Sequence, residues 1–258
     1  MNQLSDRLNS LSPSETLAMS QKSNELKAQG IDVINMSVGE PDFNTPDHIK
    51  EAAKKAVDDN FSRYSPVPGY PALHNAIVAK LKKENGLDYT PAQILCSNGA
   101  KQSVCNVLMA LIGSGDEVII PAPYWVSYPE MVKLAEGTNV IVSAGIEQDF
   151  KITPAQLEAA ITPRTKALIL CSPSNPTGSV YSKEELAGLA AVLAKYPQVV
   201  IIADETVWNY YPNYFDFIKE KKIIIPIIIS EKIKNLATCE LIWQKMSDAQ
   251  VDREALCI

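Results

Sequence analysis

Four short segments of this 258-residue chain place small, polar and aromatic residues directly after apolar runs. They are SNGAKQ (97–102), PAPYW (121–125), SPSNPTG (172–178) and IIADE (201–205). The apolar runs before them read as β-strands that alternate with helices. Because ligands of parallel sheets bind beyond the carboxyl ends of the strands, we expect the four segments to converge on one crevice.

The first segment has the composition of an anion cradle. Gly99 and Ala100 are small, so backbone N–H groups at the start of the following helix can face a phosphate, which the helix dipole also favours. The same turn is common where nothing is bound, and the chain lacks the GxxxxGK[ST] pattern of a P-loop. This segment alone therefore leaves a phosphate site and a plain turn as alternatives.

The next two segments offer groups that can contact a flat ring. Trp125 could stack on a heteroaromatic ring, although a core aromatic is the plainer interpretation. In the third segment, two prolines and a glycine within seven residues predict a stiff loop from which the Asn175 side chain can reach a ring oxygen. One X–Pro bond there is expected to be cis, and a simple turn is the alternative.

The fourth segment ends an apolar strand with a carboxylate, Asp204. A buried ionised Asp is costly unless it meets a cation, which could be a structural Arg, a helix N-terminus or a protonated ring nitrogen. A phosphate cradle, a stacking ring, a polar contact and an anion for a pyridinium together outline a site for pyridoxal 5'-phosphate.

The elements that carry these segments predict an α/β fold with a mostly parallel sheet flanked by helices. Capping boxes mark two helix starts, Thr153 with Gln156 and Ser182 with Glu185. The strands are expected at 31–38, 93–97, 116–121, 139–144, 166–172 and 198–204. The helices are expected at 13–29, from 47 onward, and at 71–84, 100–112, 125–135, 154–161 and 183–195.

Residues 1–205 resemble the class I/II aminotransferases of fold type I, the aspartate aminotransferase family. The matching stretches occur in family order and include INMSVGEPDFNTP (34–46) and RYSPVPGYPALHNAI (63–77), besides the four segments above. The resemblance implies a pyridoxal-phosphate-dependent large domain. It also implies transfer of an amino group from an amino acid to a 2-oxo acid.

The resemblance implies a role for each matching residue in its own subunit. Gly99, Ala100 and Lys101 would hold the cofactor phosphate. Trp125 would stack on the pyridine ring, and Asn175 would bond to its 3′-oxygen.

Three further residues receive roles from the same resemblance. Asp204 would pair with the ring nitrogen and make the ring an electron sink. Gly39 would line the pocket for the substrate carboxylate. Tyr64 would reach the cofactor phosphate of a neighbouring subunit, which implies a homodimer.

The resemblance stops after Glu205. Val207 stands where the family has a Tyr, and residues 230–243 read SEKIKNLATCELIW. The family's catalytic lysine is followed by Gly and Arg, and neither Lys232 nor Lys234 is followed in that way. No residue of this chain is therefore predicted to be catalytic, and an inactive cofactor-binding or dimerising fragment is the alternative to an active enzyme.

The sequence divides into three parts. Residues 1–40 are expected to form an N-terminal arm and a small-domain segment, 41–205 a partial cofactor-binding large domain, and 206–258 an unmatched tail. All 11 glycines precede the tail, whereas a continued α/β fold needs glycine at turns and helix ends. These features predict an aminotransferase truncated or frame-shifted after about residue 205, a hypothesis that the coding DNA would test.

The composition of the chain narrows the classes of partner and the cellular location that we expect. The formal charge of −6 and the lack of a basic cluster argue against nucleic acid as a partner. The first twenty residues lack the apolar run of a secretory signal, and no apolar run is long enough to span a membrane. The cysteines form no CxxC pair and indicate buried thiols in a reducing cytoplasm. They are Cys96, Cys105, Cys171, Cys239 and Cys257.

Overall fold

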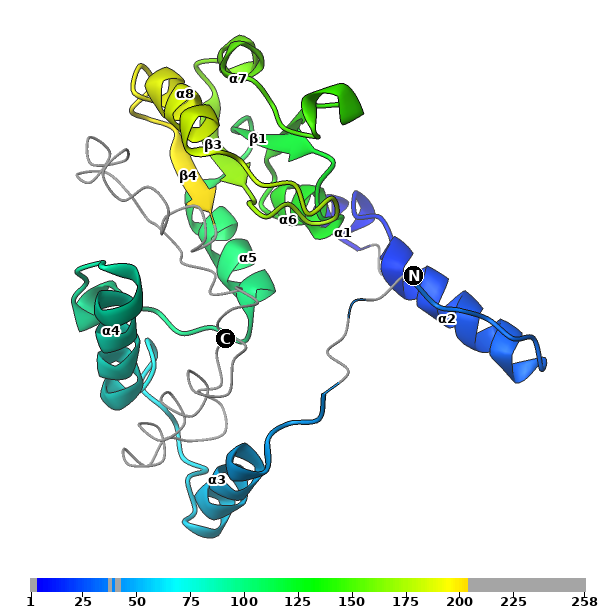
Figure 1. Cartoon of the computed structure of the whole chain (residues 1–258), viewed down its shortest axis with the longest axis vertical. Helices are drawn as coiled ribbons and strands as arrows, with labels where there is room; N and C mark the ends of the chain where they lie inside the picture. Colours follow the sequence, from blue (N-terminus) through cyan, green and yellow to red (C-terminus); the bar gives the residue numbers. More distant parts are fainter. Residues whose placement is uncertain (1–3, 37–38, 40–42, 204–258) are drawn as a thin grey trace.

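A four-stranded parallel β-sheet with strand order β2-β1-β3-β4 organises the chain (Figure 1). The computed structural model describes residues 4–36, 39 and 43–203. The strands are β1 (Glu117–Ala122), β2 (Thr138–Ser143), β3 (Thr165–Leu170) and β4 (Val200–Ala203). This arrangement confirms the predicted α/β class with a mostly parallel sheet flanked by helices.

Helices make the crossovers that a parallel sheet requires. They are α6 (Ser127–Leu134) between β1 and β2, α7 (Pro154–Ala160) between β2 and β3, and α8 (Lys183–Leu193) between β3 and β4. The helix α5 (Ala100–Leu111) leads into β1. Both predicted capping boxes are present, at Thr153 with Gln156 and at Ser182 with Glu185. A good N-cap stabilises a helix by about 1 kcal/mol.

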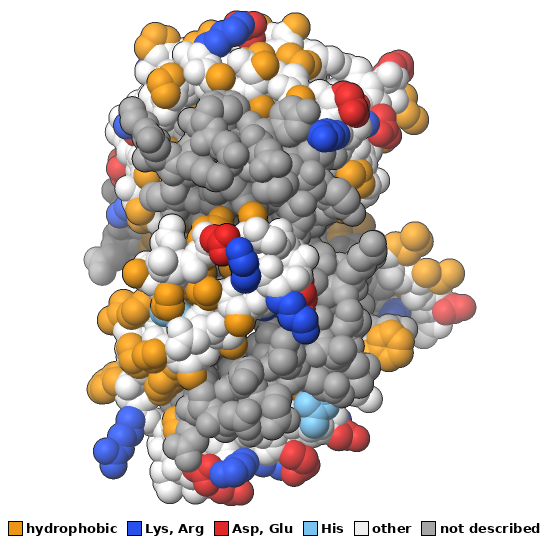
Figure 2. Space-filling model, turned by 60° about the vertical axis from the view of Figure 1, so that its left-hand side comes forward, with side chains coloured by type: hydrophobic (Ala, Val, Ile, Leu, Met, Phe, Trp, Pro, Cys, Tyr) orange, Lys and Arg blue, Asp and Glu red, His pale blue; other side chains and the backbone are white. Residues whose placement is uncertain are grey.

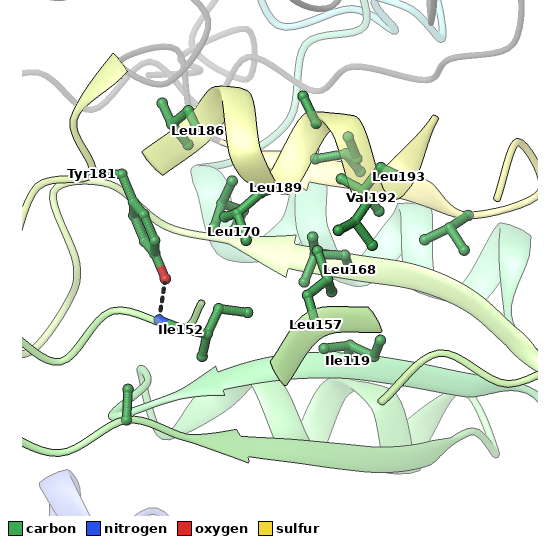
Figure 3. Close-up of a cluster of buried hydrophobic side chains, with 14 residues drawn as sticks. Ile119, Ile152, Leu157, Leu168, Leu170, Tyr181, Leu186, Leu189, Val192 and Leu193 are labelled. Carbon is green, nitrogen blue, oxygen red and sulfur yellow. Dashed lines mark hydrogen bonds between the residues drawn. The ribbon is translucent and has the colours of Figure 1, made fainter. Parts of the chain in front are cut away.

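Alternate side chains of the strands point to opposite faces of the sheet, and each face is covered by a pair of helices. On one face, Ile119 and Leu168 pack with Leu157 of α7 and Leu189 of α8 (Figure 3). The other face contacts α5 and α6. It contributes Val118, Ile120, Ala167, Ile169 and Ile202, which pack with Val104, Leu108, Met131 and Val132.

The N-terminal part contains helices with few contacts to the sheet, and Figure 1 shows α2 and α3 set apart from it. One link is the Ser12 N–H, which donates to Glu130 Oε2 of α6 at 2.8 Å. The helices are α1 (Asp6–Asn9), α2 (Glu15–Ala28), α3 (Asp47–Asp58) and α4 (Pro71–Asn85). Two short 3₁₀ helices are η1 (Pro91–Gln93) and η2 (Ile146–Gln148).

Two predicted strands are wrong. Residues 31–36 of the first have no regular structure, and the second, 93–97, gives way to η1 and an irregular segment. A strand persists only beside a hydrogen-bonded neighbour, and within the described ranges no strand pairs with either segment. Instead, the Cys96 N–H donates to Pro68 O at 3.1 Å, and Leu95 is 61% exposed.

The described cysteines are less buried than predicted. Cys96, Cys105 and Cys171 form no disulfide and are of intermediate exposure, whereas Cys239 and Cys257 lie outside the described residues. Within that part of the chain, no helix has both the length and the apolar character to cross a membrane.

A carboxylate anchors the amino end of the sheet. Glu117, only 4% exposed, accepts hydrogen bonds from Thr162 Oγ1 at 2.5 Å and from Arg164 Nε at 2.9 Å. The hydrogen bond from Thr162, followed by those from Arg164, lowers the pKa of Glu117 below its usual value. The ionised form is therefore favoured in the folded protein, and it ties the start of β1 to the turn before β3.

This anchor makes a prediction about acid stability. A carboxyl group with a lowered folded-state pKa stabilises the fold above its unfolded pKa and loses that effect as pH falls through the folded pKa. Glu117→Gln should therefore reduce the urea midpoint at about pH 7, and the difference from wild type should shrink towards about pH 3. The matched control is Glu51→Gln, on an exposed ion pair with Lys54, which should change little. An equal loss for Glu117→Gln at both pH values would contradict the assignment.

Candidate functional site

The start of α5 is an uncapped helix N-terminus. Gly99 is its N-cap with φ +82°, a region that favours glycine, and no side-chain hydrogen bond caps the helix. The N–H groups of the first helical residues, Ala100 and Lys101, have no partner within the helix. A Cβ added at Gly99 would meet no atom within 4 Å, so the approach to these donors is open. The helix start thus has N–H donors of the kind that the sequence predicted, and anion binding there stays a prediction.

The loop after β1 meets this helix start. Lys101 Nζ lies 4.9 Å from the centroid of the Trp125 ring, over its face. The other neighbour of the indole is Tyr128, whose ring meets it edge to face at 5.4 Å and an interplanar angle of 87°. The structure therefore brings together two predicted site residues, Lys101 from the start of α5 and Trp125 from the loop after β1.

Asn175 lies beyond the carboxyl end of β3 and lines a pocket shared with the loops after β1 and β2. The shared walls include Tyr124, Phe150, Cys171 and Tyr181. Tyr128 also lines the pocket, and its ring contacts the Trp125 indole, so the pocket and the indole share this neighbour. Two X–Pro bonds of the Asn175 loop are cis, at Pro173 and Pro176, where the sequence predicted one.

The remaining predicted site residues are not brought together here. Tyr64 is fully exposed, at 104%. A Cβ on Gly39 would contact nothing within 4 Å. Asp204 lies outside the described residues and follows Ala203, the last residue of β4. The binding roles of all these residues remain predictions.

The sequence did not single out the four aromatic residues of the pocket, Tyr124, Tyr128, Phe150 and Tyr181. Tyr124 had a signal, because it stands inside the segment PAPYW after a predicted strand. Phe150 and Tyr181 carried no such signal in the sequence, because each is brought to the pocket by a loop whose course the sequence does not reveal.

Pyridoxal phosphate fits the chemistry of this strand-end edge. The uncapped start of α5 suits its phosphate, and the positive charge of Lys101 adds to the dipole of the helix. Trp125 offers a ring surface, and Asn175 supplies an amide that can donate to a ring oxygen. Among the described residues, no cluster of His, Cys, Asp or Glu could hold a metal ion.

The fold and this edge define an α/β protein with a strand-end site suited to an anionic aromatic ligand. Residues 31–225 match the family model of aminotransferase class I and II. The chain belongs to this family, whose aspartate aminotransferase relatives depend on pyridoxal phosphate. The match runs twenty residues past position 205, where the motifs by themselves suggested a break.

Similar proteins agree with this assignment. Aspartate/prephenate aminotransferase of Cereibacter sphaeroides is 55% identical over 214 residues, which are 83% of this chain and 54% of the relative. A similar enzyme of Nitrosomonas europaea is 54% identical over 202 residues, 78% of this chain and 51% of the relative. The chain thus spans about half the length of the curated relatives it matches.

Solved structures show the same fold. Aspartate aminotransferase of Thermus thermophilus, solved with maleate, has a TM-score of 0.75 and 44% identity over 79% of this chain and 53% of that one. The aspartate aminotransferase of Rhizobium meliloti has a TM-score of 0.81 and 34% identity over 99% of this chain and 68% of that one.

A tight contact ties the loop that carries Tyr64 to the segment before the anion cradle. Pro68 O accepts hydrogen bonds from His74 Nε2 at 2.7 Å and from the Cys96 N–H at 3.1 Å. Gly69 has φ +114°, and a Cβ there would lie 2.9 Å from His74 Nε2 and 3.2 Å from Cys96 Sγ. Both the backbone conformation and the lack of space therefore require glycine.

Gly69→Ala should reduce the free energy of unfolding by about 1–3 kcal/mol, because it adds a steric clash to a strained backbone. The matched control is Gly115→Ala, whose φ of +89° is also strained but whose Cβ would meet nothing within 4 Å. Urea unfolding of both variants measures the difference. If Gly115→Ala costs as much as Gly69→Ala, the packing against His74 and Cys96 contributes nothing.

Proposed function

We propose that this chain is the cofactor-binding portion of an aminotransferase that moves an amino group between an amino acid and a 2-oxo acid. The observation that carries the proposal is the contact of Lys101 with Trp125 at the uncapped start of α5. This contact lies at the strand-end edge that also holds the Asn175 loop. Membership of the aminotransferase family also supports the proposal.

In the proposed site, the described residues bind and orient the cofactor. The N–H groups of Ala100 and Lys101 hold its phosphate, and the Lys101 ammonium neutralises part of the phosphate charge. Trp125 packs against the ring, and the Asn175 amide donates to the ring oxygen. When bound, the cofactor supplies an electron sink for the charge that develops when the substrate loses a proton.

Two further residues, Asp204 and Gly39, complete the proposed site. The Asp204 carboxylate pairs with the ring nitrogen and keeps it protonated. Gly39 lines the pocket for the substrate carboxylate and leaves room for it, because no side chain occupies that position.

The names of the relatives favour acidic substrates. The relatives are aspartate/prephenate aminotransferases, and the Thermus structure was solved with maleate, a dicarboxylate. We therefore infer that aspartate and a carboxylate-rich 2-oxo acid are the substrates. Cys96, Cys105 and Cys171 form no disulfide within the described part of the chain, which supports a reducing compartment such as the cytoplasm.

We also infer that the protein acts as a homodimer. Large apolar side chains are almost fully exposed, including Val67 at 96%, three residues from Tyr64, and Phe43 at 87%. Hydrophobic side chains also gather on the face shown in Figure 2. Such surfaces mark sites of protein–protein contact, and Tyr64 would reach the phosphate site of the second copy.

A protein that binds the cofactor without turnover is the second candidate function. The sequence at 230–243 favours it, since Lys232 and Lys234 are not followed by the expected Gly and Arg. Borohydride distinguishes the two candidates. Full-length protein is mixed with pyridoxal phosphate, reduced, digested and mapped by mass spectrometry, and amino transfer from aspartate is assayed in parallel.

An active aminotransferase should give one reduced, cofactor-bearing lysine peptide and measurable amino transfer. Binding that reverses on dialysis, without a modified peptide or turnover, would favour the second candidate. No binding at cofactor concentrations of about 1 mM would contradict both.

Asp204→Ala should weaken pyridoxal phosphate binding by at least about tenfold, because the ring nitrogen loses its ionic partner. Fluorescence titration measures the dissociation constant. The matched control is Asp88→Ala, which removes an exposed partner of Lys82 and should leave the affinity unchanged. Equal affinities for Asp204→Ala and wild type would overturn the placement of Asp204.

A further inference from the structure

The loop that carries Asn175 is closed by its own hydrogen bonds. The Ser174 N–H donates to Ser179 O at 2.9 Å, and the Gly178 N–H donates to Ser174 O at 2.8 Å. At the base of the loop, the Tyr181 N–H donates to Ser172 Oγ at 3.1 Å. Asn175 therefore moves with the loop 172–181 as a unit, and its position depends on what holds this unit to the rest of the protein.

Lys151 holds the loop from outside. Its ammonium lies 3.3 Å from Val180 O, 2.9 Å from Glu185 Oε1 and 3.1 Å from Asp149 Oδ2. The Lys151 side chain is 15% exposed, whereas those of Glu185 and Asp149 are 41% and 67% exposed, so the ammonium is more shielded from water than its carboxylate partners. The ammonium therefore joins the loop, the first turn of α8 and the segment after β2.

Two more hydrogen bonds connect the same pair of segments. The Ile152 N–H donates to Tyr181 Oη at 2.9 Å inside the core, as Figure 3 shows. Ser179 Oγ lies 3.3 Å from Asp149 Oδ1. Because β1 separates β2 from β3 in the sheet, the segment after β2 must pass over the end of β1 to make these contacts.

The backbone of this crossing segment is strained. Asp149 and Phe150 are consecutive non-glycine residues in the left-handed region, with φ of 51° and 56°. Such residues persist only where surrounding contacts hold them. The Asp149 and Phe150 N–H groups donate to Ile146 O and Gly145 O, each at 3.0 Å, and Lys151 Nζ lies 3.1 Å from Asp149 Oδ2. Phe150 lines the same pocket as Asn175.

The charges of this network are stable near neutral pH. The hydrogen bond to Glu185 is the main cause that raises the pKa of Lys151. Partial burial works to raise the pKa of Glu185, but the hydrogen bonds from Lys151 and the Ser182 N–H outweigh it and lower that pKa. Both groups are therefore ionised under physiological conditions.

We propose that Lys151 is a positioning residue that fixes Asn175 against the cofactor ring by clamping the loop 172–181 to the segment after β2. The inference rests on the proposed cofactor function. Lys151 lies on the outside of the loop and makes no contact with the cofactor. It acts on the cofactor only through the loop.

The clamp itself is tested without cofactor. Hydrogen–deuterium exchange of the full chain should show about five- to tenfold faster exchange at the amides of Ser174, Gly178 and Tyr181 in Lys151→Met. The matched control is Lys195→Met, which removes a lysine from an ion pair with Glu158 and should leave these amides unchanged. Lys151→Arg should restore slow exchange, because it keeps the charge.

The positioning role is tested with pyridoxal phosphate and a double-mutant cycle. Lys151→Met and Asn175→Ala should each weaken binding about five- to tenfold. The double variant should bind no more weakly than Asn175→Ala, because both substitutions remove the same contact, that of Asn175 with the cofactor. The pH midpoint of the absorption band of bound cofactor should shift in the same direction in both single variants.

The outcomes separate the two claims. Unchanged loop exchange in Lys151→Met overturns the clamp, whether or not the cofactor binds. Faster exchange with fully additive losses in the cycle also overturns the positioning role, since Lys151 then acts on the fold in general. If wild type binds no cofactor, the proposed function fails and the positioning role falls with it, even where the loop loosens.

Discussion

The parallel pairing of β1 with both of its neighbours is the constraint on which the site depends. β1 pairs in register with β2 along its whole length and with β3 over Val118 and Ile119. The carboxyl ends of these strands therefore meet at one edge, where the loops that follow them are forced together. Glu117 fixes the opposite end of the same strand through Thr162 and Arg164, so both ends of β1 are held.

Packing of α5 places the start of this helix at the same edge. Val104 and Leu108 are buried against Val118 and Ile120, which sets the line of the helix across one face of the sheet. Its amino end then reaches the loop after β1, where Lys101 meets Trp125. The charge of −6 on the whole chain matters less for anion binding than this local arrangement. Charges beyond about 8 Å are largely screened at physiological salt, whereas the helix start and Lys101 would act at contact distance.

Local signals in the sequence were sufficient for most of the sheet and for part of the site. The apolar runs predicted β1 to β4, and both capping boxes were readable because donor and acceptor stand three residues apart. The strands expected at 31–38 and 93–97 failed because an apolar run does not reveal whether a partner strand lies beside it. Lys101 and Trp125 were expected to lie close because each follows a predicted strand, and they do so although, among the described residues, no strand precedes α5. The prediction for Asp204 remains untested.

The clamp illustrates why the supporting parts of a site are harder to predict than its contacting parts. Asn175 stands in a segment whose prolines and glycine mark it locally. The contacts of Lys151 reach 29 and 34 residues along the chain, to Val180 and Glu185, and a lysine in a polar stretch carries no sign of them. These contacts exist only because β1 lies between β2 and β3 and the segment after β2 has to cross it. Strand order therefore determines both where the proposed cofactor contacts meet and which residues hold them in place.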